Sequence, residues 1–558
     1  MTDTRTAPTA PTPPLPRWAT GADRPDAVVI GAGPNGLVAA NHLADHGWTV
    51  VVLEASSTPG GAVRSAELIE PGYVHDVCSA FYPLAARSRA LTDLSLEDHG
   101  LQWLHAPQVL AHPTSDGSCP VLSRDLDTTA ASLDLDHPGD GEAWRSLYQR
   151  WLDLEPVLLD TFLSPLPPVR GLVGMLQRLP PRDLARFARF AILPVRRLGD
   201  EEFGGESARR LLAGAALHAD LAPETALSGF LGWLLCSLGQ RDGFPVPEGG
   251  ASSVTDALVR RLEGLGGTVV CDAPVTRVEV RGGRALGVEL ADGTPVPATR
   301  AVLADVNAPM LYTRLVEAEH LPSSVLRDIE RFQWDDSTFK VDWTLDGPVP
   351  WTAPAAREAG TVHVTEGVDA LTVVASELAR GLVPADPFLL VGQQSMTDPT
   401  RQPEGKETLW AYTHVPRRFR GDAGGELVGD WGASDVERFT ERVEARIEAL
   451  APGFRSLIRG RHVLSPRSFE EENPNLDKGA INGGTAQLHQ QLIFRPTPGT
   501  GRNATPIKGL FLASASAHPG GGLHGAAGRN AARAAVAADR RRLPGRRLVE
   551  RRRATARS

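Results

Sequence analysis

The 558-residue chain has only four cysteines, Cys78, Cys119, Cys236 and Cys271, and no two of them form a Cys-x-x-Cys pair. This absence argues against a redox-active disulfide and against a zinc site, so no metal is expected. Thiols stay free in a reducing compartment, and a cytoplasmic location is therefore expected.

Long hydrophobic runs are also absent. The longest uncharged apolar stretch, residues 226–238, is too short to cross a bilayer and is interpreted as a buried helix. Residues 1–25 lack the apolar core of a secretory signal and are rich in Pro, Thr and Ala, which predicts a disordered tail.

The net charge of −9 gives no indication of nucleic acid binding. Residues 541–558 form a basic tail, which we interpret as a second disordered end. Contact of this tail with an anionic membrane, giving a membrane-peripheral protein, is the alternative.

The first ordered segment has the pattern strand, glycine turn, helix, strand, which predicts a βαβ unit. Its turn contains Gly31, Gly33 and Gly36 in the spacing Gly-x-Gly-x-x-Gly. These glycines permit a tight turn, close approach to a pyrophosphate and close packing of helix on strand. Glu54 ends the second strand, 23 residues after Gly31, where a ribose-binding carboxylate is expected.

A second motif narrows the ligand to FAD. Glu54 is followed by Gly60, Gly61 and Arg64, a Gly-Gly-x-x-Arg segment that an NAD domain does not need. A flavin domain uses such a segment to hold the pyrophosphate from the other side, with the arginine as a fixed cation.

A third motif, "HPGGGLHG", covers residues 518–525 between a short strand and an alanine-rich helix. Its glycines would allow the backbone to approach a flat ring, and the helix would direct its N-terminus at the flavin or its phosphates. His518 and His524 are candidates for contact with the isoalloxazine, or they are hydrogen-bonded structural histidines.

Together with Pro247-x-Gly249-Gly250, these motifs resemble the phytoene-desaturase-like FAD-dependent oxidoreductases. The segments "FKVDWTL", "VGQQSMTDPTRQPEGKETLWAYTHVP" and "GGLHGAAGRNAARAA" resemble most the branch named for pyridine nucleotide-disulphide oxidoreductase domain-containing protein 2. The resemblance covers residues 26–539.

This resemblance implies an α/β protein with an α+β cap. A Rossmann-like FAD-binding domain of the glutathione-reductase/amine-oxidase type would be interleaved with a substrate domain. Residues 24–90, 245–308 and 500–540 would form the FAD-binding domain, and residues 91–244 and 309–499 the substrate or cap domain.

By the motifs and the resemblance together, a defined set of residues would bind FAD. Val275 would meet the adenine through its backbone, and residues 76–81 would lie near the flavin. Ser514 stands where many relatives have glycine or an acidic residue, which argues against a carboxylate contact there. The full set is Gly31, Ala32, Gly33, Pro34, Asn35, Gly36, Glu54, Ala55, Gly60, Gly61, Arg64, Val275, Gly521, Gly522, Leu523 and His524.

The expected activity is desaturation or dehydrogenation of a small lipophilic substrate by hydride transfer to flavin N5. No second Gly-x-Gly-x-x-Gly is present for NADPH, so oxygen, a quinone or another carrier is expected to accept the electrons. Amine oxidation is an alternative, although only five tyrosines are available for an aromatic cage. An FAD-binding regulatory protein without turnover is an alternative of another class.

No residue is assigned to catalysis. No acid–base pair stands out in the sequence, and Lys340, His363 and His414 are candidates only for residues that line the substrate cavity.

Overall fold

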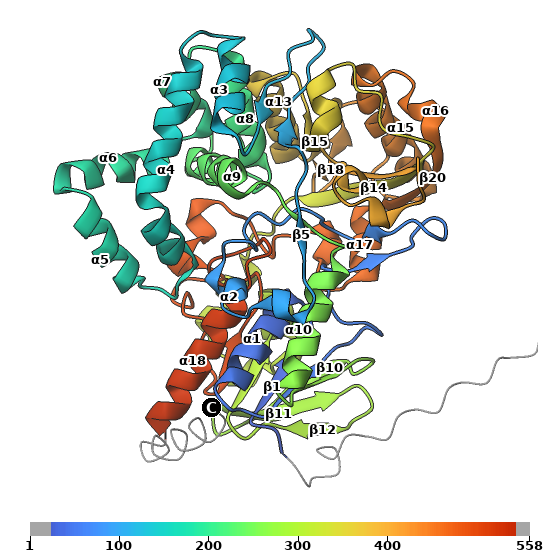
Figure 1. Ribbon diagram of the computed structural model, residues 1–558. Helices are drawn as coiled ribbons and strands as arrows, with labels where there is room; N and C mark the ends of the chain where they lie inside the picture. Colours follow the sequence, from blue (N-terminus) through green and yellow to red (C-terminus); the bar gives the residue numbers. More distant parts are fainter. Residues whose placement is uncertain (1–23, 543–558) are drawn as a thin grey trace, which may run out of the picture.

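The computed structural model describes residues 24–542. The predicted tails, residues 1–25 and 541–558, therefore lie almost wholly outside the described residues. Arg541 and Arg542 continue the last helix, α18 (Ala526–Arg542). In Figure 1 the chain forms a lower part around β1 and an upper part that contains the larger sheet.

The lower part is built on a parallel five-stranded sheet of order β21-β13-β1-β2-β9. Strands β1, β2, β13 and β21 are buried runs of apolar residues, as expected for a parallel sheet covered on both faces, whereas the edge strand β9 is partly exposed. The strands are β1 (Ala27–Ile30), β2 (Val50–Leu53), β9 (Thr268–Val270), β13 (Ala301–Ala304) and β21 (Leu510–Leu512).

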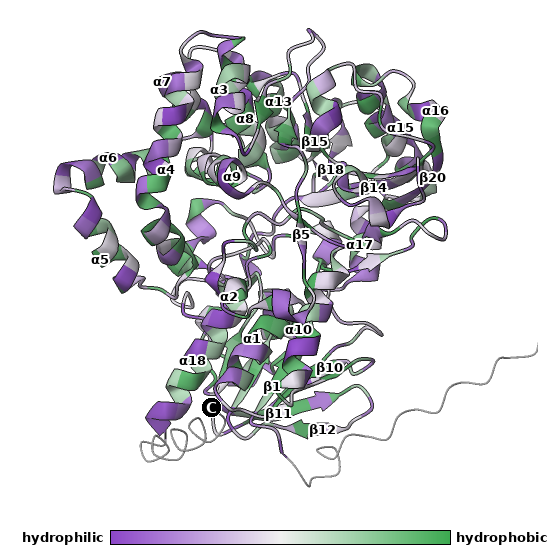
Figure 2. Ribbon diagram, in the orientation of Figure 1, coloured by the Kyte–Doolittle hydropathy of each residue, from purple (hydrophilic) through white to green (hydrophobic). Residues whose placement is uncertain are grey.

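Alternate residues of these strands pack into two different hydrophobic cores, one on each face of the sheet. Val29 and Leu303 pack under helices α1 (Pro34–Asp45), α10 (Ser252–Gly264) and α18. Val28 and Val302 pack on the opposite face, against a three-stranded antiparallel sheet. That sheet consists of β10 (Val275–Arg281), β11 (Arg284–Leu290) and β12 (Pro295–Pro297). The apolar character of β1 and its neighbours is visible in Figure 2.

All five parallel strands come from the three segments predicted to bind FAD, so β1 and β21, about 480 positions apart in the chain, belong to one sheet with only β13 between them. Because parallel strands end at the same edge, the turns after β1, β2, β13 and β21 meet there. The α/β fold class with a Rossmann-like sheet is thereby confirmed.

The upper part contains a seven-stranded mixed sheet of order β20-β14-β18-β17-β15-β6-β7. Helix α15 (Ala433–Leu450) contributes to the apolar core on one face of it. The strands are β6 (Gln108–Ala111), β7 (Val121–Leu122), β14 (Ser337–Leu345), β15 (Ala359–Val364), β17 (Leu389–Gly392), β18 (Glu407–Val415) and β20 (Ile458–Leu464).

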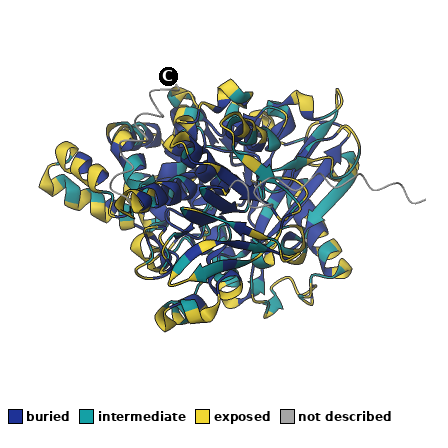
Figure 3. Cartoon of the chain, turned by 90° about the horizontal axis from the view of Figure 1, so that it is seen from below, coloured by how far each residue is buried: buried dark blue, intermediate teal, exposed yellow. Residues whose placement is uncertain are grey.

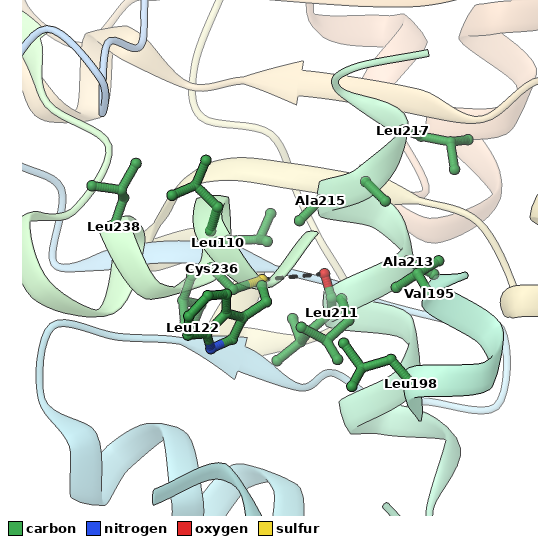
Figure 4. Close-up of a cluster of buried hydrophobic side chains, with 14 of the residues drawn as sticks. Leu110, Leu122, Val195, Leu198, Leu211, Ala213, Ala215, Leu217, Cys236 and Leu238 are labelled. Carbon is green, nitrogen blue, oxygen red and sulfur yellow. Dashed lines mark hydrogen bonds between the residues drawn. The ribbon is translucent and has the colours of Figure 1, made fainter. Parts of the chain in front are cut away.

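A helical layer covers the other face. Within it, α8 (Glu206–Leu217) packs on α9 (Ser228–Asp242), the buried helix expected near residues 226–238. Figure 4 shows part of the apolar cluster that surrounds these two helices, with the hydrogen bond from Cys236 to the Leu211 carbonyl oxygen. Cys236 donates this bond through Sγ at 3.5 Å. The other helices are α3 (Leu126–Asp134), α4 (Asp140–Leu163), α5 (Val169–Arg178), α6 (Pro181–Ile192), α7 (Val195–Glu202) and α13 (Val368–Arg380).

Shorter elements connect these layers. They include β3 (Ser65–Ala66), β4 (His75–Asp76), β5 (Trp103–Leu104), β8 (Val246–Pro247), β16 (Leu382–Val383), β19 (Gly421–Asp422), α2 (Arg89–Thr92), α11 (Ala308–Met310), α12 (Ser323–Glu330), α14 (Gln394–Thr397), α16 (Phe454–Leu457) and α17 (Pro466–Glu472). Among residues 24–542, no helix has both the length and the apolar character required to cross a membrane.

The close packing of α18 on α1 gives a testable prediction. A Cβ at Gly528 would collide with the Asn35 carbonyl oxygen, so Gly528→Ala must push the two helices apart. We expect about 1–3 kcal/mol of destabilisation, measured as a lower midpoint of thermal unfolding. Gly264→Ala is the matched control, since its Cβ would meet nothing within 4 Å; a loss of stability there equal to that of Gly528→Ala would contradict the argument.

Candidate functional site

The turn between β1 and α1 has no room for side chains. Gly31 has φ +90°, and a Cβ on it would lie 2.8 Å from the Asp305 carbonyl oxygen. A Cβ on Gly33 would lie 2.6 Å from Asp305 Oδ2, and one on Gly36 would collide with the Gly31 carbonyl oxygen. Pro34, which has no N–H, begins α1, and the Asn35 N–H of the first helical turn lies beside a bare backbone surface.

Glu54 closes this turn from the end of β2. Its carboxylate accepts hydrogen bonds from the Ala32 N–H at 2.7 Å and the Ser56 N–H at 2.9 Å. Each carboxylate oxygen has a further lone pair, so Glu54 can still accept from a ribose hydroxyl. Ala55 lies between these contacts, at the start of the turn after β2.

Asp305 is a site residue that the motif search missed. It follows β13, and its Oδ2 accepts a hydrogen bond from the Gly36 N–H at 2.8 Å. Burial raises the pKa of Asp305 to about 7, and the nearby Glu54 contributes in the same direction. The segment "AVLAD" could have indicated this residue, because its aspartate directly follows a predicted strand. In a parallel sheet, such a residue lies at the same sheet edge as the turn after β1.

Gly60 and Gly61 form a second turn against the first. The Gly60 N–H donates to the Ala32 carbonyl oxygen at 2.9 Å, and a Cβ on Gly61 would lie 3.3 Å from Gly33 Cα. Arg64 donates through Nε to the Gly61 carbonyl oxygen at 2.8 Å and pairs with Glu472 at 2.7 Å. The guanidinium is thereby held next to both glycine turns.

The last glycine loop, residues 518–525, reaches the same helix. A Cβ on Gly525 would lie 2.8 Å from Val38 Cγ2. Ser88 Oγ donates to the His524 carbonyl oxygen at 2.5 Å. Gly521 lies against Asn482, so the loop joins α1 to the cap segment around residue 482.

Both histidines of this loop are buried and neutral at pH 7, since burial lowers the pKa of each to about 4. His524 Nδ1 accepts from the Ala526 N–H at 3.0 Å, and His518 Nε2 lies 3.1 Å from the Ser164 carbonyl oxygen. These bonds hold the loop in place, and contact of either ring with flavin stays a prediction. Ser514 is buried and its Oγ accepts from the Ser516 N–H.

Val275 and the segment 76–81 lie at two different places. Val275 begins β10 and pairs with Leu290. Asp76 is fully buried and its Oδ2 lies 2.5 Å from Arg401 Nη1. Phe81 reaches the cavity described below.

These contacts fit FAD. Three glycine turns from distant parts of the chain meet at the N-terminus of α1, and a Cβ would fill the space in each. Glu54 suits a ribose and Arg64 a phosphate. The carboxyl group of Asp305 at the helix N-terminus opposes an anion.

An inner cavity of about 250 Å³ adjoins the last glycine loop. Gly521, Gly522 and Leu523 form part of its wall. Most of the remaining wall is apolar, with leucines of α9 and the rings of Phe81 and Phe162. Trp410 and Tyr412, whose rings stack at 5.8 Å between centroids, also line it.

An outer cavity of about 520 Å³ lies on the other side of the same wall. Leu217 and Asp220 face it, whereas His218, between them in the chain, faces the inner cavity. His414 lines this outer cavity and pairs with Asp220 at 2.9 Å, an ion pair that raises the pKa of His414 to about 9.

Two other candidate cavity residues lie elsewhere. His363 lines neither cavity, but its Nε2 lies 2.8 Å from Nε2 of His218. Lys340 lines neither and is buried against Asp342, with 2.5 Å between Nζ and Oδ2. The sequence alone could not show which candidates line a cavity, because a buried lysine on a strand can either pair with a carboxylate or point into a cavity.

The ionisation of Asp305 predicts a pH dependence of FAD binding. Below pH 7 the carboxyl group is neutral; above it the charge repels the pyrophosphate, so FAD affinity should fall as pH rises from 6 to 8.5. Asp305→Asn keeps an acceptor for the Gly36 N–H and should remove this fall, binding roughly tenfold more tightly at pH 8.5. Fluorescence titration of each apoprotein with FAD, at pH values from 6 to 8.5, measures the affinity of the wild type and of the variant.

Gly33→Val is the control for that experiment. It should lose yellow, stoichiometric FAD at every pH, because its side chain would occupy the space of the pyrophosphate. An unchanged pH profile in Asp305→Asn would contradict the role of this carboxyl group.

Two proteins of other organisms are similar to this chain over most of its length. Pyridine nucleotide-disulfide oxidoreductase domain-containing protein 2 of Mus musculus is 29% identical, over 93% of this chain and 96% of the relative. The neurosporene-forming phytoene desaturase of Rhodobacter capsulatus is 26% identical, over 89% and 91%.

Among solved structures, cyclohexylamine oxidase from Brevibacterium oxydans has the same fold, with a TM-score of 0.56 and 19% identity over 94% of this chain and 100% of that chain. The profile of the family described as FAD dependent oxidoreductase matches residues 26–333. The chain therefore belongs to the FAD dependent oxidoreductase family, and FAD is its cofactor.

Proposed function

We propose that the protein dehydrogenates or desaturates a lipophilic substrate held in the inner cavity. The three glycine turns with Glu54, Arg64 and the N-terminus of α1 would hold FAD, and Val275 its adenine. The observation that carries this proposal is continuity: Gly521, Gly522 and Leu523 belong both to the predicted cofactor loop and to the wall of the cavity.

The cavity favours an apolar substrate because most of its lining is aliphatic or aromatic and no Asp, Glu, Lys or Arg lines it. Bound FAD would supply an acceptor for two electrons. The chain itself would orient the substrate against the glycine loop and exclude water. Oxygen, a quinone or another carrier would then reoxidise the cofactor.

Amine oxidation is the second candidate. Phe81, Trp410 and Tyr412 bring three aromatic rings to the cavity, and such rings can flank an amine. The carboxylate of Asp220 lies behind the wall, on the outer cavity, and is paired with His414. This pairing leaves no counter-ion for a substrate ammonium in the inner cavity.

Anaerobic mixing separates these activities. We expect a polyene or an apolar lipid to bleach the flavin absorption band, and amines of similar size to leave it unchanged. The reason is the apolar, uncharged lining. Bleaching by amines alone would favour the second candidate. A flavin band that no substrate class bleaches, alongside tight binding to another protein, would favour a regulatory protein without turnover.

We also propose that the protein contacts an anionic membrane surface through α5 and α6. These helices project from the body at the left of Figure 1, and the same projection is largely exposed in Figure 3. The segment 169–193 has five arginines and one aspartate, although the whole chain has a net charge of −9. This local positive charge complements anionic lipid.

Helix α5 turns its glycines to the protein and its large apolar side chains to solvent. Gly171 and Gly174 pack on α4, where a Cβ on Gly174 would lie 2.6 Å from Val157 Cγ1. Val169, Leu172, Val173 and Leu176 are between 47% and 60% exposed. Phe162, at the end of α4, lines the inner cavity, so this surface adjoins the proposed substrate site.

A double variant, Leu172→Glu with Leu176→Glu, should abolish binding to vesicles of phosphatidylserine and phosphatidylcholine. It removes apolar area and adds charge that anionic lipid repels. Co-sedimentation measures the loss, and Gln177→Glu, on the polar side of the same helix, is the matched control. Dimerisation through this face, seen by light scattering and lost in the double variant, would contradict the proposal.

A further inference from the structure

One wall of the inner cavity bears three uncharged hydrogen-bonding side chains. His218 caps the C-terminus of α8, Thr361 is on β15 and Tyr412 is on β18. Thr361 is only 2% exposed, and its Oγ1 has no hydrogen-bond partner within the described part of the chain. The Tyr412 hydroxyl likewise makes no hydrogen bond to residues 24–542, although Tyr412 is largely enclosed.

The tautomer of His218 follows from its partner. His218 Nε2 and His363 Nε2 are 2.8 Å apart, so one of them carries the proton that they share. His363 Nδ1 is buried against α8 at Gly214 and has no partner among the described residues. An orphaned buried N–H is rarer than an orphaned acceptor, so the proton of His363 belongs on Nε2.

His363 therefore donates to His218, and the proton of His218 is on Nδ1. No other group within residues 24–542 accepts a hydrogen bond from this Nδ1–H. Burial and the nearby positive His414 lower the pKa of His218 to about 3, so the ring stays neutral at pH 7. The cavity thus offers a neutral N–H donor together with two hydroxyl groups.

We infer that the inner cavity selects an uncharged apolar molecule that carries one hydrogen-bond acceptor oxygen, such as a carbonyl or hydroxyl, over a charged amine or carboxylate. This inference rests on the proposed function and specifies its substrate class. A bare hydrocarbon would leave the buried donors unpaired, which costs binding free energy. An ammonium or a carboxylate would lose its hydration without a counter-ion.

Three ten-carbon ligands test the inference on the FAD-loaded protein: 2-decanone, 2-aminodecane as its ammonium, and decanoate. Equilibrium dialysis should give at least tenfold tighter binding of the ketone than of either ion. The infrared carbonyl band of bound 2-decanone should lie below its position in an alkane, because a hydrogen bond weakens the C=O bond.

His218→Leu should weaken ketone binding roughly threefold to tenfold and return the carbonyl band toward its alkane position. His218→Asn places an amide N–H near the position of Nδ1 and should preserve both. Tyr412→Phe removes a second donor without leaving a void in the packing, and it should move the carbonyl band part of the way toward its alkane position. His46→Leu, an exposed histidine at the end of α1, is the matched control.

Equal affinity for the three ligands would overturn the inference. So would a carbonyl band that stays at its wild-type position in folded His218→Leu. Circular dichroism monitors folding, and Tyr412→Phe gives the same answer if His218→Leu does not fold. Failure of every substrate class to bleach the flavin band would overturn only the proposed function, since dialysis measures ligand preference without turnover.

Discussion

The backbone-on-backbone contact at the N-terminus of α1 is the constraint on which the rest of the structure depends. Gly33 and Gly36 let Asp305 approach from β13, and Gly528 lets α18 approach from the C-terminal end of the chain. Each contact would be lost with the addition of one methyl group, because interiors this dense cannot absorb an extra carbon without moving backbone. The position of both glycine loops, and hence of the cavity wall, follows from these contacts.

A buried charge network links this site to the cap. Arg401 pairs with Asp76 and Asp398, and its Nη2 donates to the Pro247 carbonyl oxygen at 3.0 Å. Asp76 also accepts from the Ala251 N–H at 2.6 Å, at the start of α10. Removal of one partner from such a network destabilises the fold by more than the intact network stabilises it, because an unpaired buried charge remains. The network therefore determines how the two parts are oriented more than it contributes to stability.

The sequence predicted the parallel sheet and the motifs well, since these depend on local pattern. Glycine spacing, buried apolar runs and the buried helix near residues 226–238 can be recognised without knowing any distant neighbour. Asp305 was not recognised, because its significance arises from a strand brought next to β1 by the fold. Lys340 was considered for the cavity, but Asp342, two residues away on the same strand, pairs with it.

The cavity wall was the least predictable feature. His218 follows a helix made largely of alanine and leucine, and nothing near it in sequence indicates a site. Its role depends on His363, 145 residues further along, and on Gly214, which gives the His363 ring space. Such a pair is recognised only after β15 and α8 have been placed together.

The arrangement of the parallel sheet also governs the order of events during synthesis. β1 leaves the ribosome early, but its neighbour once removed, β21, and the covering helix α18 are the last of the described elements to be made. At translation rates of roughly 5–20 residues per second, β1 waits roughly 25–100 s for them. During that interval its apolar strands lack their final cover, so the nascent chain is a natural client for a chaperone. The complete FAD-binding edge cannot assemble before β21 and the last glycine loop have been made.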